Sequence, residues 1–371
     1  MDYSKSGVNI DLGDEASKIL YDAAKQTFDN RKGNIGEVIV PFDDFSGVRV
    51  IDVSNLPPGS LMCMGFDGVG TKVEIAQRMG DHSTIAFDLF AMVCDDAVLR
   101  GAEPVLIGSV LDVKSLGRGE DNNIELIKQL ADGYVKAAKD ANVAVINGEL
   151  AELGDVVGGY GKFQYNWCSG LVWFANKDRL ITGKKVTVGD SIVVLEETGF
   201  RSNGLSLTRK VFEDKYGEEW HNVEFDGKKL GTYVLIPSKI YSSFIVHLNG
   251  GFQTEGCCKI HAVSHLTGGG IPGKLGRVLK PSGLGADLND LFTPSKAMLH
   301  CQDVGDVEDI EAYKTWNMGQ GMAIITPQPE KVIAEAPKFG IKARLAGKVI
   351  NEAKIKITSK GFNSPGDILE F

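Results

Sequence analysis

Two kinds of apolar segment alternate along the chain. Short runs rich in branched and aromatic residues predict strands, and in the first half these fall at 61–65, 105–113, 143–146 and 167–175. Longer segments, in which apolar residues recur every three to four positions, predict helices, and these fall at 15–27, 84–100 and 122–140. Strands that alternate with helices indicate an α/β (α+β) protein.

The alternation begins again after a polar stretch, Asn176-Lys177-Asp178, which is typical of a domain boundary. The second half predicts strands at 186–195 and 323–326 and a helix at 205–212. Because a chain of 371 residues is too long for one ordinary core, we predict two domains, residues 1–176 and 177–371.

The composition narrows the classes of partner. A net charge of -9 and a pI near 5.3 argue against a nucleic-acid or anionic-membrane partner. No apolar run reaches the length of a membrane span, and Met1 to Ser6 lack a signal-peptide core, so we expect a cytoplasmic protein. The six cysteines show no CxxC or Cys/His ligand spacing. They indicate neither a zinc site nor disulfides, but reduced and mostly buried thiols.

Candidate chemistry begins where the first of these strands ends, at Asp67-Gly68-Val69-Gly70-Thr71-Lys72. Two glycines beside a carboxylate, a hydroxyl and an ammonium are typical of a loop that brings backbone close to a charged ligand. The stretch is not a P-loop, because that motif needs Gly-Lys-Ser/Thr in this order. We therefore expect Asp67 in a loop and a phosphate site of another design.

The helix predicted at 84–100 carries three carboxylates among apolar residues, at Asp88, Asp95 and Asp96. Asp96 falls on an apolar stripe with Ile85 and Leu99, where an unpaired carboxylate is costly. Metal or phosphate chemistry is therefore favoured for Asp96. The alternative is that these acids cap backbone amides or pair with a basic residue such as Lys72, and for Asp88 we favour that alternative.

Three further loops are candidates. Asn147-Gly148-Glu149 follows a strand and offers another carboxylate on a glycine-hinged loop. Arg201-Ser202-Asn203-Gly204 precedes a helix, so the Ser-Asn pair can cap that helix, and with Arg201 it can also form an anion pocket. Thr267-Gly268-Gly269-Gly270 is either a ligand loop or a tight turn. Nearby, His261 and His265 can flank a turn or bind metal.

Taken in order, these motifs resemble the aminoimidazole ribonucleotide synthetase (phosphoribosylformylglycinamidine cyclo-ligase) family of purine biosynthesis. The matching stretches are 6–11, 67–72, 88–104, 147–152, 201–207, 265–270 and 313–322. They are spread over nearly the whole chain, so chance does not explain the likeness.

The resemblance implies an N-terminal sheet domain that dimerises and a C-terminal α/β sandwich domain, with ATP and Mg²⁺ bound in clefts near the dimer interface. It also implies an ATP-dependent cyclo-ligase, in which ATP activates the formamide oxygen of formylglycinamidine ribonucleotide. The amidine nitrogen then closes the imidazole ring, and ADP and phosphate are released. The implied partners are a phosphoribosyl nucleotide substrate and a second copy of the chain.

Carried over position by position, the resemblance assigns Asp67, Asp96 and Glu149 to Mg²⁺, which prefers hard oxygen ligands. It gives catalytic roles to Asp67, Lys72 and Asp96, and contacts to the nucleotide to Gly68, Gly70, Thr71, Asp95 and Glu149. It assigns contacts to the substrate to Arg201, Ser202, Asn203, Gly204, Thr267, Gly268, Gly269 and Gly270.

The chain departs from the family pattern at three places. The glycine- and phenylalanine-rich loop near the N-terminus is reduced to Gly33 and Gly36, Arg201 replaces the usual histidine, and 273–277 keeps only the arginine of Glu-Asn-x-Pro-Arg. Two alternatives therefore stay open. One is another ATP-dependent synthetase or kinase of the same superfamily, and the other is a non-catalytic nucleotide-binding paralogue.

Overall fold

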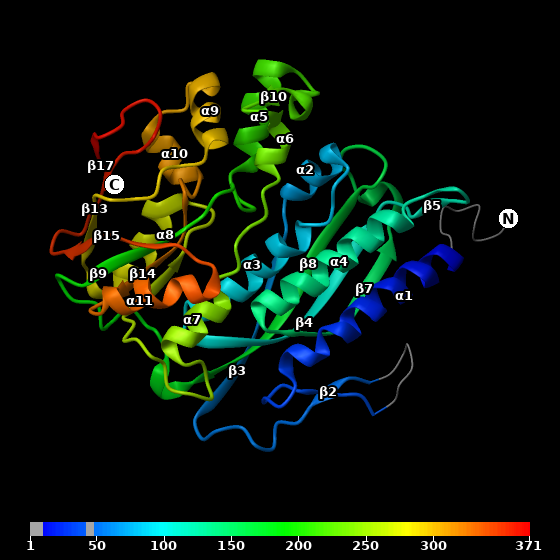
Figure 1. The fold of residues 1–371 in the computed structure, drawn as a ribbon, viewed down its shortest axis with the longest axis horizontal. Coiled ribbons are helices and arrows are strands. Elements are labelled where there is room, and N and C mark those ends of the chain that lie inside the picture. The colour runs from blue at the N-terminus through cyan, green and yellow to red at the C-terminus, as the bar shows by residue number, and fades with distance from the viewer. Residues whose placement is uncertain (1–9, 42–47) are drawn as a thin grey trace.

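The computed structural model describes residues 10–41 and 48–371, so most of the motif at 6–11 lies outside the described residues. Two sheets, one in each half of the chain, form the framework of the described part (Figure 1). The first sheet consists of β3 (Ser60–Gly68), β8 (Tyr165–Asn176), β4 (Ala102–Val113) and β7 (Ala144–Glu152), in this spatial order. β8 is antiparallel to β3 and β4, whereas β4 and β7 are parallel.

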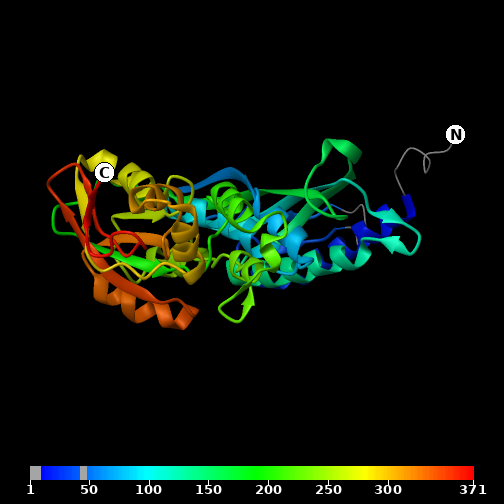
Figure 2. The same ribbon diagram turned by 90° about the horizontal axis from the view of Figure 1, so that it is seen from above.

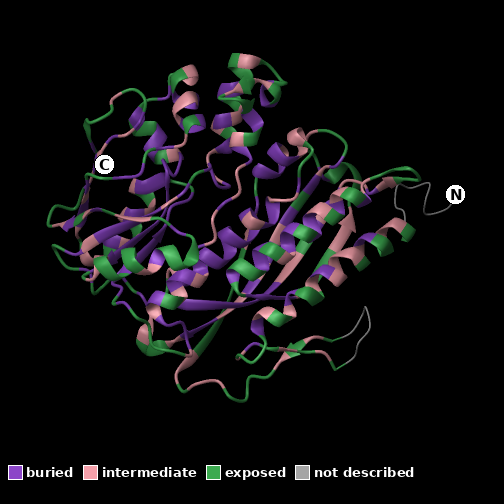
Figure 3. Cartoon of the chain, viewed as in Figure 1, coloured by how far each residue is buried: buried purple, intermediate pink, exposed green. Residues whose placement is uncertain are grey.

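Among the residues that the structure describes, helices cover only one face of the first sheet. These are α1 (Ile10–Gln26), α3 (Ile85–Val98) and α4 (Ile124–Ala141), and α4 is also the crossover that makes β4 and β7 parallel. Figure 3 shows α3 buried along most of its length, between the sheet and its neighbouring helices. The other face of the sheet is open, and on β3 it presents the side chains of Met62, Met64 and Phe66. Residues two apart on a strand share a face, so these three form an apolar stripe.

The second sheet has the spatial order β12 (Ala262–His265), β14 (Gln320–Thr326), β9 (Ser191–Glu196), β15 (Ala343–Ile350), β13 (Gly285–Leu288), β16 (Ile355–Thr358) and β17 (Ile368–Glu370). Only β13 and β16 pair in parallel among these strands. β14 is buried at every position, because this sheet is covered on both faces.

Alternating residues of β9 divide the helices of the second half between the two faces. Ile192 and Val194 pack with α5 (Leu205–Tyr216), α8 (Gly270–Leu279), α9 (Lys296–Gly305) and α10 (Asp309–Thr315). Val193 and Leu195 pack with α7 (Ser242–Asn249) and α11 (Pro329–Glu335). Figure 2 shows α11 lying on one side of the second sheet.

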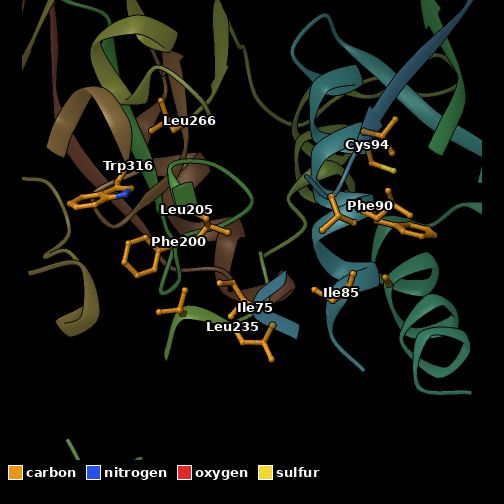
Figure 4. Packing of buried hydrophobic residues seen from close by; sticks show 14 of the residues in the cluster. Ile75, Ile85, Phe90, Cys94, Phe200, Leu205, Leu235, Leu266 and Trp316 are labelled. Atoms are coloured by element: carbon orange, nitrogen blue, oxygen red, sulfur yellow. The ribbon is translucent and has the colours of Figure 1, made fainter. Parts of the chain in front are cut away.

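Apolar packing joins the two halves. Ile75, from α2 (Lys72–Met79), and Ile85 belong to the same buried cluster as Phe200, Leu235 and other residues of the second half, as Figure 4 shows. α7 packs against the C-terminal part of α3 through the second cluster, which includes Val98. The division of the chain at residues 176 and 177 remains a prediction.

The expected elements form, with several changes in their bounds, and α1 begins at Ile10 and not near residue 15. β3 continues through Asp67 and Gly68, β7 continues through Glu152, and β9 covers 191–196 and not 186–195. The smaller elements are α6 (Leu230–Val234) and the strand pairs β1 (Val38–Ile39) with β2 (Val50–Ile51), β5 (Gly117–Arg118) with β6 (Asp121–Asn122), and β10 (Glu224–Phe225) with β11 (Lys228–Lys229). None of the helices in the described part of the chain is both long and apolar enough to cross a membrane.

Candidate functional site

Asp67 is the penultimate residue of β3, so the expectation that it lies in a loop is wrong. Pairing with β8 extends to Gly68, and only 69–71 separate the strand from α2. The Asp67 side chain accepts a hydrogen bond from the amide of Gly68 at 2.7 Å. Burial raises the pKa of Asp67, and the negative charge of Asp96 raises it further. The carboxylates of Asp67, on β3, and Asp96, on α3, therefore lie close together at this end of β3.

Two of the three carboxylates of α3 are buried and one is exposed to solvent, and the exposed one is not the one that the apolar stripe predicts. The Asp96 side chain is 53% exposed, whereas Asp88 and Asp95 are fully buried. α3 is packed on nearly all sides, so an apolar stripe does not mark one inward face. Asp96 is therefore not at the buried position that its place on the apolar stripe predicts. Asp96 lies where the packing around α3 opens to solvent.

His265, at the end of β12, forms a hydrogen bond with the Asp96 carboxylate. Its Nδ1 lies 2.7 Å from Asp96 Oδ1, and its Nε2 lies 2.7 Å from Arg201 Nη2. A guanidinium can only donate, so Nε2 accepts and the ring proton is on Nδ1, which donates to Asp96. Burial and the charge of Arg201 lower the pKa of His265 to about 4. The ring is therefore neutral at neutral pH and orients the carboxylate.

Asp96 is the ionised member of the pair. Burial alone would raise its pKa, but the hydrogen bond from His265 and the positive charge of Lys274 outweigh that effect and lower it. His265 ends β12 directly before the loop at 266–269, and His261 likewise bonds a carboxylate, that of Asp190, at 2.7 Å.

Arg201 is enclosed and is not presented to a ligand. Its side chain is 1% exposed, and it pairs with Glu197 Oε2 at 2.8 Å and with Asp95 Oδ2 at 3.2 Å. Burial raises the pKa of Asp95 to about 7 against the opposing charge of Arg201, and the negative charge of Asp96 adds to the rise. The expected direct contacts of Arg201 with the substrate and of Asp95 with the nucleotide therefore disagree with their positions in the structure.

Lys72 is enclosed in the same way. Its Nζ lies 2.7 Å from Asp88 Oδ1 and 2.5 Å from the carbonyl oxygen of Ile236, and no part of its side chain is exposed. The pairing alternative favoured for Asp88 is confirmed, and the phosphate contact expected of Lys72 is not compatible with this burial. We call Lys72, Asp88, Asp95, Glu197 and Arg201 the buried charge layer.

The segment 236–241, which belongs to the second half of the chain, covers the buried charge layer. Ser238 Oγ donates to Asp88 at 2.5 Å, and the amide of Tyr241 donates to Asp95 at 2.9 Å. The amide of Lys239 donates to Glu197 at 3.1 Å. Each buried carboxylate thus has a backbone or hydroxyl donor in addition to its cation, as a buried charge requires.

Three helices begin close to one another in front of the buried charge layer. α2, α5 and α8 are capped by Thr71, Gly204 and Gly269, respectively. A Cβ placed on Gly70 would lie 4.0 Å from the carbonyl oxygen of Ser202, and one on Gly268 would lie 3.0 Å from Asn203 Oδ1, so the three loops are neighbours. The first turns of three helices therefore offer backbone amides and positive dipole ends to one region, which suits an anion.

The Ser-Asn pair does not cap α5. The cap is Gly204, in the left-handed conformation with φ 77°, and no side chain bonds the first amides of the helix. Ser202 Oγ is buried and has no hydrogen-bond partner among the described residues, and the Asn203 amide lies 3.7 Å from Met92 Sδ. The capping role expected of this pair is therefore wrong, and its role in binding an anion stays a prediction.

Glycine is required at two positions of these loops. A Cβ at Gly204 would collide with the Trp316 ring, and one at Gly270 would collide with the carbonyl oxygen of Tyr313. Both residues also have positive φ angles, 77° and 59°. Thr267, which precedes the glycines, is buried. The loops at 201–204 and 267–270 are thus packed closely against α10 and the residue that follows it.

Lys274 is the site residue that sequence reasoning missed. It lies on the first turn and a half of α8, where its charge acts on both Asp67 and Asp96. Burial and the nearby Arg277 lower the pKa of Lys274, while the two carboxylates act in the other direction. The departure from the family pattern at 273–277 was the available signal. We call Asp67, Asp96 and Lys274 the open cluster.

Glu149 does not join the open cluster within one chain. It lies on β7 and not in the expected loop, and its row of the sheet runs through Val110 and Cys168 to Gly68. Three strand spacings separate the two ends of that row, or about 14 Å. Glu149 and Asp67 do line one hollow of about 720 Å³ on the open face of the sheet. A single ion bound by both carboxylates is excluded by that distance.

Comparisons with known proteins give the family. The model of the AIR synthase related protein N-terminal domain matches residues 47–165, and that of the C-terminal domain matches residues 187–360. The phosphoribosylformylglycinamidine cyclo-ligase of Alkaliphilus metalliredigens is 32% identical over 356 residues, which cover 95% of this chain and 96% of that protein. The enzyme of the same name from Pyrococcus horikoshii is 32% identical over 362 residues, covering 97% and 98% of the two chains.

Solved structures share the fold at lower identity. Thiamine-monophosphate kinase from Stenotrophomonas maltophilia has a TM-score of 0.62 at 13% identity and covers 94% of this chain and 97% of its own. The hydrogenase maturation protein HypE in complex with ATP has a TM-score of 0.55 at 15% identity and covers 86% and 87%. The two domain models and the full-length relatives show that the chain belongs to the AIR synthase-related protein family.

Proposed function

We propose that this protein is an ATP-dependent cyclo-ligase that converts formylglycinamidine ribonucleotide into aminoimidazole ribonucleotide in purine biosynthesis. The observation that carries the proposal is the match at 32% identity to cyclo-ligases over 95% of this chain. In the reaction, ATP activates the formamide oxygen, the amidine nitrogen closes the ring, and ADP and phosphate leave. We expect the reaction to take place in the cytoplasm.

ATP and Mg²⁺ are the cofactors we propose, and the open cluster fits them. Asp67 and Asp96 are close enough for the charge of one to raise the pKa of the other, a repulsion that a bound cation would relieve. Both offer carboxylate oxygens, the donors that Mg²⁺ prefers. When bound there, Mg²⁺ would neutralise phosphate charge.

The remaining steps fall to side chains and backbone of this chain. The first amides of α2, α5 and α8 would bind phosphate oxygens. Lys274 would supply a positive charge beside these phosphate oxygens, and the hydroxyl of Ser202 could donate a hydrogen bond to one of them. His265 holds Asp96 in one orientation through its Nδ1 proton. The buried charge layer takes no direct part and fixes the loops from which these groups project.

The open face of the first sheet supports the expected homodimer. The open sheet face presents Met62, Met64 and Phe66 at 63%, 53% and 75% exposure, an apolar stripe that isolated soluble proteins rarely leave uncovered. We propose that a homodimer covers it, and that Glu149 bounds the nucleotide pocket from the far side of the 720 Å³ hollow. Sedimentation should give a dimer, and Phe66→Asp should give a monomer of about 40 kDa. A wild-type monomer at micromolar concentration would contradict this proposal.

ADP release distinguishes the proposed reaction from its alternatives. We expect release to require Mg²⁺ and to be stimulated by formylglycinamidine ribonucleotide. Equal release with and without that acceptor would exclude the cyclo-ligase and leave another ATP-dependent enzyme of the fold. Nucleotide binding without any release, under conditions in which a cyclo-ligase relative turns over, would identify a non-catalytic paralogue.

A further inference from the structure

A second group of metal-binding side chains lies away from the open cluster, where α7 and α11 meet (Figure 1). It consists of His247 near the end of α7, Cys257 in the following loop, and Glu335 at the end of α11. We propose that these three side chains form a binding site for Zn²⁺. The proposal is independent of the reaction assigned above.

The distances suit one small ion. His247 Nε2 lies 2.8 Å from Glu335 Oε2 and 3.5 Å from Cys257 Sγ, and the three donor atoms all lie within 4.8 Å of one another. Zinc bonds of about 2.0–2.3 Å in a tetrahedron place neighbouring donors about 3.3–3.7 Å apart. Rotations of exposed or half-exposed side chains are enough to reach that arrangement.

The chemistry of the donors selects the ion. A nitrogen, a sulfur and a carboxylate oxygen are the ligand types that Zn²⁺ takes together, whereas Mg²⁺ and Ca²⁺ avoid sulfur. With a thiolate, a carboxylate and a neutral imidazole, the bound ion has no net charge. Binding releases the thiol proton to solvent, so affinity should rise with pH. Three protein ligands leave the fourth position to water.

Neighbouring residues both support and oppose this site. The Phe339 ring packs on the His247 ring, with centroids 5.2 Å apart, and limits its rotation. Lys331 Nζ donates to the carbonyl oxygen of Cys257 at 3.3 Å, which ties the loop to α11. Against binding, Lys338 Nζ holds both Glu335 oxygens, at 2.7 and 2.8 Å. The Lys338 ammonium must move aside, so we expect Glu335 to add less affinity than the other two ligands.

The position of the site gives it a consequence for the fold. α7 packs on α3 from the first half of the chain, while α11 packs on the second sheet, and both belong to the cluster that contains Val98 and Val332. A metal ion bound by His247, Cys257 and Glu335 would therefore link these layers on the surface above their shared core.

The test uses the full-length protein, stripped of metal and kept reduced in excess Mg²⁺. We expect one equivalent of Zn²⁺ to bind, and Co²⁺ in its place to show a thiolate-to-metal charge-transfer band. Cys257→Ser should abolish the band. Cys257→Ser and His247→Gln should each weaken Zn²⁺ binding by more than about a hundredfold, which exceeds the loss expected when a residue only orients a metal ligand. Glu335→Gln should weaken it by about tenfold.

Cys63→Ser is the matched control, because Cys63 is also an exposed free thiol but belongs to no metal-ligating group among the described residues. It should keep the band and the affinity. Zn²⁺ should also raise the melting temperature of the wild type and of Cys63→Ser but not of His247→Gln. A cooperative melting transition without Zn²⁺ verifies that each variant is folded. No saturable uptake by the wild type, or uptake unchanged in both Cys257→Ser and His247→Gln, would overturn the proposal.

Discussion

The buried charge layer and the open cluster adjoin each other at α3, where His265 contacts both Arg201 and Asp96, and both groups consist of carboxylates facing a lysine or an arginine. In the layer, each cation is sealed against its carboxylates, as Lys72 is against Asp88. In the cluster, Asp96 is half exposed and Lys274 acts on two carboxylates without an ion pair to either within 4 Å among the described residues. The contrast shows that solvent access, and not residue type, separates supporting charges from charges that can meet a ligand.

This difference predicts opposite outcomes for similar substitutions. A change in the layer leaves a buried charge without its partner, which costs stability before it costs activity. A change in the cluster removes charge from a solvated place, which costs little stability but removes an interaction with the reacting groups.

The largest effect should come from the layer. Asp88→Ala leaves the Lys72 ammonium buried and unpaired, which should cost about 3–5 kcal/mol of unfolding free energy. Thermal and denaturant unfolding followed by circular dichroism measure this loss. The double variant Lys72→Met/Asp88→Leu is the control, since replacing both charges with apolar groups should recover most of it. A single variant as stable as the wild type would show that the pair is not a supporting one.

Asp96→Asn should lower kcat by two or more orders of magnitude, about 3 kcal/mol in activation free energy, because in the proposed reaction its charge would hold Mg²⁺ against the transferred phosphate. Its melting temperature should change little, since the side chain is half exposed. Asp95→Asn, one residue earlier and fully buried, should show the reverse pattern. If Asp96→Asn loses melting temperature and keeps its specific activity, Asp96 belongs with the supporting charges.

Lys274→Met should raise the KM of a phosphorylated ligand by about tenfold, or about 1.4 kcal/mol, with kcat within a few-fold. The reason is that Lys274 adds positive charge to a region already supplied with helix amides. Lys280→Met, at an exposed residue directly after the end of the same helix, should leave both constants unchanged. A fall in kcat at constant KM for Lys274→Met would instead place this lysine in the chemical step.

The last expected effect is a pH dependence of stability. Burial lowers the pKa of His265 and of His82 to about 4, below the value of about 6.5 in an unfolded chain. The unfolded state thus binds more protons between these values, and stability present above about pH 6.5 is lost as the pH falls toward 4. Asp95 opposes this slope, because a raised carboxyl pKa gives stability that is lost as the pH rises through about 7.

His82 and His265 separate this effect from catalysis. His82 packs beside Phe163 and bonds the Tyr165 hydroxyl at 2.9 Å. His82→Asn should flatten the decline of melting temperature in acid and leave the pH profile of activity unchanged. His265→Asn should flatten the same decline and also reduce activity, because Asp96 loses its orienting donor. Identical activity profiles in the two variants would contradict the role assigned to His265.

Much of the architecture could be predicted from local pattern. The helices at α3 and α4 and the strands β4 and β8 have periodicities that burial on one or two faces requires. Asp67 and Asp96 stood out because a carboxylate at the end of an apolar run or within an apolar helix needs a reason. What the pattern could not give is where the packing around α3 opens, since that depends on α4, α7 and the segment 236–241.

The same limit explains Lys72, Arg201 and the proposed zinc site. Ile236 and Ser238 lie more than 140 residues from the charges that they cover, so nothing near Lys72 marks it as enclosed. His247 and Cys257 are ten residues apart, and Glu335 follows 88 residues after His247. No ligand-spacing motif describes such a set, because loop and helix packing bring it together.

Trp316 makes the loop at 201–204 observable in solution. Its indole nitrogen donates to the carbonyl oxygen of Gly204 at 3.1 Å, and its ring meets Phe200 edge-on at 5.7 Å. An indole buried against the first turn of α5 is an intrinsic fluorophore whose emission responds to rearrangement of that turn. The chain has four tryptophans, so replacing the other three with phenylalanine would leave a single optical reporter. Stopped-flow fluorescence of that variant would then time ligand arrival at the loop separately from ADP release.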